Sequence, residues 1–197
     1  MLNEIFLWIN NHFIEVLGTI IGILYIFLSI KQNIWCWPAG LITSLLYVYV
    51  FFISKFYADM GLQVYYVFVS IYGWYFWKYG GTKNNIIVKV STTSFALGIK
   101  LFFINAVLFG FIAFILVKYT DSPLPYWDAF TTALSIVATW MLARKIIEHW
   151  ILWVLIDSVS LALYFYKELY STVILFAIYT VLAIIGYLAW RKDLKKI

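Results

Sequence analysis

The chain has 197 residues, of which 65% are hydrophobic, 22% are aromatic and only 12% are charged. An ordinary soluble domain carries about 25% charged residues, so this composition excludes a water-soluble fold. The net charge of +5 arises from basic residues in short loops between apolar runs, which argues against nucleic acid as a partner. Cys36 is the only cysteine, so an internal disulfide and a thiolate metal site are excluded.

Seven apolar runs, each about the length that crosses a bilayer, follow the first twelve residues. We predict that each run is a transmembrane helix, because backbone amides inside lipid must bond within the protein and the alternating pattern of barrel strands is missing from the sequence. The predicted spans are residues 13–30, 34–53, 62–77, 95–117, 127–142, 147–166 and 171–190. The sequence therefore predicts an all-α polytopic membrane protein with seven transmembrane helices.

Residues 1–12 lack the basic start and the cleavage site of a secretory signal. Their apolar residues stand at helical spacing, which is typical of a short interfacial helix on the outer surface. An extension of the first span explains the same spacing, and neither interpretation is linked to a function.

Lysine and arginine accumulate in cytoplasmic loops, so their distribution predicts the orientation. If Lys100, at a helix edge, is left out, one side collects ten of these residues: Lys31, Lys78, Lys83, Lys89, Arg144, Lys145, Arg191, Lys192, Lys195 and Lys196. The other side has only Lys55, Lys118 and Lys167. We therefore expect the amino terminus outside and the carboxyl terminus in the cytoplasm, as an odd number of spans requires.

An internal repeat appears when the chain is aligned with itself at a spacing of 113 residues. The aligned pairs are Lys31 with Arg144, Trp37 with Trp150, Tyr57 with Tyr170, Tyr66 with Tyr179, Gly73 with Gly186 and Trp77 with Trp190. The register pairs spans one to three with spans five to seven and leaves span four as a linker. This pattern predicts a 3+1+3 parallel repeat, in which two halves rock around a solute near mid-membrane, and it favours a transporter.

Asp157 is an ionisable residue deep inside a predicted span, ten residues from Lys167 and twelve from Lys145. At about 1.5 Å per residue this places it near the bilayer centre, where an unpaired carboxylate is costly. Trp150, Trp153 and Asp157 are spaced i, i+3 and i+7 and so share one helix face. Two indoles and a carboxylate suit an aromatic cation, so we interpret this stripe as a binding wall, although Trp150 near the inner edge also fits an interfacial tryptophan.

Three more polar residues are candidate solute contacts in the first half. Ser44 aligns with Asp157 at the 113-residue spacing, and Thr43 is adjacent to it. Each hydroxyl either faces the solute or donates a hydrogen bond to a carbonyl one turn earlier. Gln63, near the outer end of the third span, is either a solute contact or a hydrated interfacial residue.

Other motifs indicate packing rather than chemistry. Gly18 and Gly22, four residues apart, predict close approach of a neighbouring helix. His12 and His149 have no companion ligands, so we predict no metal site and no cofactor. A membrane enzyme would need a catalytic partner for Asp157, which the sequence does not offer. A channel or a sensor stays open and would differ from a carrier in lacking saturable, competable uptake.

Short strings that follow one another along the chain resemble the PnuC family of vitamin transporters, whose best-known member carries nicotinamide riboside. They are EVLGTIIG (15–22), YADMGLQV (57–64), GWYFW (73–77), WDAF (127–130), LSIVA (134–138) and RK with WILW (144–145, 150–153). The resemblance implies a fold like that of SWEET sugar porters, a homotrimer in the bacterial inner membrane, and facilitated diffusion trapped by a cytoplasmic kinase. It also implies that Trp150, Trp153 and Gln63 contact the solute.

Two positions depart from the family pattern, because Asp157 and Thr43 stand where that pattern, in the nicotinamide riboside carriers, has Asn. A carboxylate only accepts hydrogen bonds, so Asp157 favours amino donors and positively charged rings. Thiamine fits these requirements at least as well as nicotinamide riboside, which is the substrate that the resemblance implies by default, and both stay open. The predicted organisation is an N-terminal repeat (1–94), a linker helix with an outer loop (95–126) and a C-terminal repeat (127–197).

Overall fold

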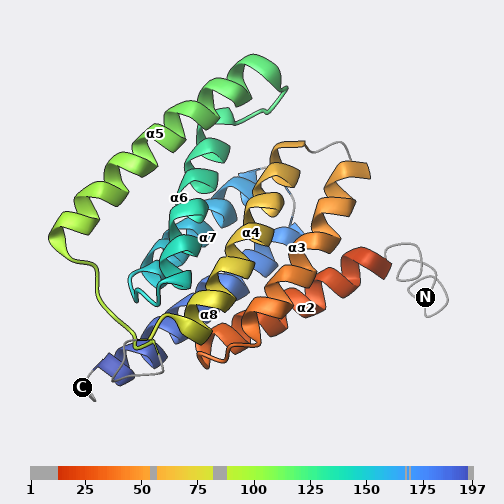
Figure 1. Cartoon of the computed structure of the whole chain (residues 1–197). Coiled ribbons are helices and arrows are strands. Elements are labelled where there is room, and N and C mark those ends of the chain that lie inside the picture. The colour runs from red at the N-terminus through yellow and green to blue at the C-terminus, as the bar shows by residue number, and fades with distance from the viewer. Residues whose placement is uncertain (1–12, 54–56, 82–87, 167, 169, 195–197) are drawn as a thin grey trace. The chain divides into compact units, whose positions relative to one another are not determined.

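The computed structural model describes residues 13–53, 57–81, 88–166, 168 and 170–194, so the interfacial helix predicted for residues 1–12 lies outside the described part. The regular elements of the described residues are seven helices (Figure 1). They are α2 (Phe13–Ile30), α3 (Cys36–Ile53), α4 (Tyr57–Tyr79), α5 (Phe95–Tyr119), α6 (Pro125–Ala143), α7 (His149–Tyr166) and α8 (Tyr170–Leu194).

The all-α prediction is confirmed, and each predicted span overlaps one helix. α2 matches its predicted bounds, whereas α4 begins five residues earlier than residue 62 and α8 continues four residues past residue 190. The ends have local causes. Ser94 accepts a hydrogen bond from the Leu97 amide at the start of α5, and Pro125 begins α6 in the first turn, where a free amide is not needed.

Four of the described helices are long and apolar enough to cross a membrane by length and composition: Cys36–Ile53, Phe95–Tyr119, His149–Tyr166 and Thr172–Leu194. Several spans of this kind in one chain make this a multi-pass membrane protein. Large apolar side chains lie exposed along them, for example Phe102, Val107 and Phe111 on α5, as expected where the surroundings are lipid.

The helices fall into two compact units, Met1–Ile87 and Val88–Ile197. In the first unit α3 packs against both α2 and α4, and in the second α7 packs against both α6 and α8, with α5 against α6. The predicted linker helix is thus grouped with the second unit. The predicted division at residues 94 and 126 and the parallel arrangement of the repeats stay predictions.

The two units nevertheless share one local structure at the predicted 113-residue spacing. After α2, Gln32 has a φ of 53°, and the Asn33 amide donates to the Leu28 carbonyl. After α6, Lys145 has a φ of 54°, and the Ile146 amide donates to the Met141 carbonyl. Each is a Schellman-type helix end, closed by a left-handed residue. The next helix begins after the same short turn in both units.

Beyond each turn, a tryptophan lies against a glycine of the unit's last helix. Trp37 packs on Gly73 and meets the Trp77 ring edge-on at 5.3 Å; Trp150 packs on Gly186 and meets Trp190 at 5.8 Å. These rings are buried, and the glycines let the helices approach closely because no Cβ stands between them. The aligned tryptophans and glycines of the sequence are therefore contacts within each unit.

The segment before α5 is tied to the turn between α6 and α7. Ser91 donates to the Lys145 carbonyl and accepts from the Ile147 amide, which makes an isolated parallel bridge between Ser91 and Ile146. The amide and the hydroxyl of Thr93 both donate to the Glu148 carboxylate at 3.0 Å.

We expect Glu148→Ala to lower the free energy of unfolding by about 2 kcal/mol, because the variant loses a charged acceptor of two hydrogen bonds. Thermal unfolding of the purified protein in detergent measures this. Asp121→Ala, at an exposed carboxylate, is the control and should leave the midpoint unchanged. Equal midpoints for the two variants would contradict the proposed tie.

Candidate functional site

The stripe predicted on α7 is present, but its three members have different surroundings. Trp150 is 4% exposed and Asp157 is 5% exposed, whereas Trp153 is half-buried. All three belong to one continuous helix, so their spacing along it is fixed.

Asp157 has neither a hydrogen bond nor an ion pair with any residue that the structure describes. The helices packed against α7 are α6 and α8, and their charged residues lie near their ends: Asp128 in the first turn of α6, and Arg191, Lys192 and Asp193 in the last turns of α8. A buried carboxylate is destabilising unless a positive charge or hydrogen-bond donors compensate it. Asp157 is therefore suited to accept a donor or a cation from outside the chain.

Trp153 packs against an apolar cluster of Leu134, Ala138 and Ile156, which joins α6 to α7. This contact restrains the indole, while half-burial leaves part of its surface accessible for stacking. A restrained indole near a carboxylate is the arrangement that attracts a flat cation.

Trp150 is enclosed by its own unit. Its ring lies against Gly186, 5.8 Å from Trp190 and 4.6 Å from the ring of His149. It therefore offers little surface to a solute, and its predicted role as a solute contact stays a prediction.

His149 was not singled out by the sequence as part of this region. It is fully buried between Trp150 and Trp190, and its Nδ1 pairs with the Ile146 carbonyl at 2.6 Å while Nε2 has no partner among the described residues. Its place could be found from the 113-residue register, which aligns His149 with the equally buried Cys36.

Thr43, Ser44 and Gln63 belong to the first unit. The Thr43 methyl faces Gly22. Its Oγ1 is buried without a hydrogen-bond partner among the described residues, so the bond back to the preceding turn is not made. Ser44 is buried and Gln63 half-buried. Gly18 lies against Tyr47, which confirms that Gly18 and Gly22 pack against the neighbouring helix. A common solute site for these residues and the α7 stripe stays a prediction.

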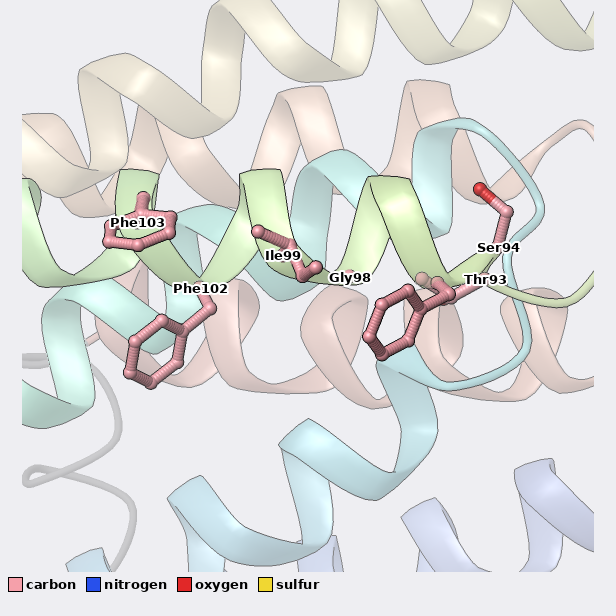
Figure 2. A pocket seen from close by; sticks show the side chains of 7 residues that line it. Thr93, Ser94, Gly98, Ile99, Phe102 and Phe103 are labelled. Carbon is pink, nitrogen blue, oxygen red and sulfur yellow. The ribbon is translucent and has the colours of Figure 1, made fainter.

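A surface hollow beside α5 has a different character (Figure 2). It is lined by Thr93, Ser94, Phe95, Gly98, Ile99, Phe102 and Phe103. The lining comes from one helix and the two residues before it, and it contains no ionisable side chain. It therefore lacks the charge that a cationic solute requires.

The long apolar helices define the class of protein as a multi-pass membrane protein. The chain matches the nicotinamide mononucleotide transporter family over residues 12–192 and belongs to that family. Its family is one of transporters, and the chain is not an enzyme.

Individual relatives agree with this assignment. The nicotinamide riboside transporter PnuC of Escherichia coli is 30% identical over 93% of this chain and 87% of its own length. The riboflavin/roseoflavin transporter RibM of Streptomyces davaonensis is 28% identical over 97% of this chain and 93% of its own length. A crystal structure of the vitamin B3 transporter PnuC superposes with a TM-score of 0.76 at 23% identity, covering 98% of this chain and 87% of that one, and so shares the fold.

We expect Thr43→Val to preserve or raise stability, by up to about 1 kcal/mol, because it removes a buried hydroxyl that has no partner. If Thr43 contacts the solute, the dissociation constant of the protein for that solute rises several-fold in the same variant. Thr19→Val is the control, since the Thr19 hydroxyl pairs with the Tyr47 hydroxyl at 2.9 Å and its loss should lower stability. Thermal unfolding and calorimetry measure the two effects; an unchanged dissociation constant removes Thr43 from the site.

Proposed function

We propose that this protein carries nicotinamide riboside into the cell across the inner membrane of a bacterium. The observation that carries the proposal is Asp157, a buried carboxylate without a partner in the described residues, on one helix face with Trp153. The relatives' names support the substrate, and the family supports transport.

The chemistry of nicotinamide riboside matches this stripe. Its pyridinium ring is flat and positively charged, so it stacks on the Trp153 indole and neutralises the Asp157 carboxylate. Its carboxamide N–H groups can donate to the same carboxylate, which only accepts. The contacts of the pyridinium ring and the carboxamide with Asp157 offset the free-energy cost of burying this carboxylate, which is not compensated in the empty protein.

The same carboxylate favours the riboside over its phosphate ester. Nicotinamide mononucleotide carries a phosphate of about −2 charge, and a second anion near a buried carboxylate is repelled. Phosphorylation of the solute by a cytoplasmic kinase therefore weakens binding to the carrier and prevents its return. This supports facilitated diffusion with metabolic trapping, without a coupled energy source.

The Asp157 carboxylate distinguishes other vitamins from nicotinamide riboside by their charge. Riboflavin, named for one relative, is neutral and gains no ion pair with Asp157. Thiamine is cationic and suits the carboxylate, but the relatives and the family name favour nicotinamide compounds over thiamine.

The transport cycle in this proposal is alternating access, in which the two units move around the solute and Gln63, Thr43 and Ser44 of the first unit complete the site. The repeated turn and the repeated tryptophan–glycine contact support two related units. The basic loops support an outer amino terminus and a cytoplasmic carboxyl terminus. A homotrimer is the assembly that the family resemblance implies.

We expect Asp157→Ala to raise the dissociation constant for nicotinamide riboside at least about 100-fold, because the ion pair in an apolar site is lost. Isothermal titration of the purified protein measures this, with thiamine and riboflavin as comparison ligands. Asp157→Asn should shift the preference from thiamine toward nicotinamide riboside.

Asp121→Asn is the matched control at an exposed carboxylate and should bind as the native protein does. Native-like affinity of Asp157→Ala would contradict the assigned role of Asp157. Tight binding of thiamine or riboflavin without binding of nicotinamide riboside would replace the proposed substrate.

A further inference from the structure

The contact between Gly186 and Trp150 leaves no room for a side chain. A Cβ built on Gly186 lies 2.7 Å from the Cδ2, Cε2 and Cη2 atoms of the Trp150 indole, closer than real carbon atoms approach. The glycine therefore sets the separation between α8 and α7 at this level.

Trp150 cannot easily move away from an added methyl group. The His149 ring lies 4.6 Å from it and the Trp190 ring meets it edge-on at 5.8 Å, and both neighbours are fully buried. A dense cluster of this kind transmits a displacement instead of absorbing it. α7, which carries Trp150, and α8, which carries Gly186, must then shift or rotate against each other.

We propose that Gly186 is a positioning residue for solute binding, which acts through Trp150 to place Trp153 and Asp157 on α7. The inference rests on the proposed function, because these two side chains are the proposed solute contacts. Asp157 lies two helical turns from Trp150 on the same stripe, so a shift of α7 at Trp150 moves the carboxylate as well. Binding geometry tolerates displacements of only a fraction of an ångström to about 1 Å.

The first unit contains the same contact without the same stripe. Gly73 packs against Trp37 even more closely, and Trp77 lies edge-on as Trp190 does. At the positions that align with Trp153 and Asp157 at the 113-residue spacing, however, the first unit has Gly40 and Ser44. A Cβ on Gly40 would lie 3.0 Å from the Tyr25 ring and 3.3 Å from the Ser70 hydroxyl, so Tyr25 covers that position. Gly73 is therefore the matched comparison for Gly186, because its clash moves a helix that brings uncharged hydroxyls to the proposed site instead of a carboxylate.

The test compares Gly186→Ala with Gly73→Ala in the purified full-length protein, by thermal unfolding and by titration with nicotinamide riboside. Gly110→Ala is a neutral control, since a Cβ there meets nothing within 4 Å. Both clash variants should unfold at a lower temperature. Gly186→Ala should raise the dissociation constant for nicotinamide riboside by at least about 10-fold, because it moves the charged contact. Gly73→Ala moves only the uncharged hydroxyls of Thr43 and Ser44 and should change the same constant by less than about 3-fold.

A second substitution distinguishes positioning from a general loss of structure. Trp150→Phe removes ring atoms that the new methyl group would meet, so Gly186→Ala/Trp150→Phe should bind more tightly than Gly186→Ala alone. If Gly186→Ala does not fold, Trp150→Phe and Trp37→Phe form the pair to compare, and Trp150→Phe should weaken binding more than Trp37→Phe does.

The inference would be overturned if Gly186→Ala and Gly73→Ala, or Trp150→Phe and Trp37→Phe, changed the dissociation constant equally. It would also be overturned if the double variant bound nicotinamide riboside no more tightly than Gly186→Ala. If Asp157→Ala abolishes binding while Gly186→Ala binds normally, the inference fails and the proposed function stands. Lack of binding by the native protein would refute both.

Discussion

The site depends on one constraint, the unfavourable free energy of burying an unpaired carboxylate in an apolar helix. Asp157 is 5% exposed, and none of the residues described on α6, α7 or α8 pairs with it. Such a group is unfavourable in a protein that only has to fold, since an apolar residue there would be more stable. In the proposed function a cationic solute supplies the missing charge, so that binding and charge neutralisation are one event.

The rest of the second unit holds that carboxylate in place. The Schellman turn at Lys145 begins α7 in a fixed register, and Glu148 ties the same turn to Thr93. Trp150 then fixes α7 against Gly186 on α8, while Trp153 packs toward α6. The first unit repeats the turn and the tryptophan–glycine contact but carries Ser44 in place of the carboxylate. The shared features therefore build the helices of each unit, and the proposed solute contact lies among the residues that differ.

Hydropathy runs and helical spacing predicted the helices and the α7 stripe, because both depend on short-range sequence. They could not tell which neighbour covers each face of a helix. Trp150 and Trp153 look alike on a helical wheel, yet one lies against Gly186 on α8 and the other packs toward α6. The 113-residue register did contain the missing information, since it aligned Trp37 with Trp150 and Gly73 with Gly186 as separate pairs. Only the structure shows that Trp37 touches Gly73 and that Trp150 touches Gly186.

The most direct measurement is an experimental structure of the protein with nicotinamide riboside bound. A pyridinium ring stacked on Trp153, with its carboxamide or its charge within hydrogen-bonding or ion-pairing distance of the Asp157 carboxylate, is the predicted result. A solute bound elsewhere, with Asp157 facing lipid or paired with a residue of the protein, would contradict the role given to this carboxylate.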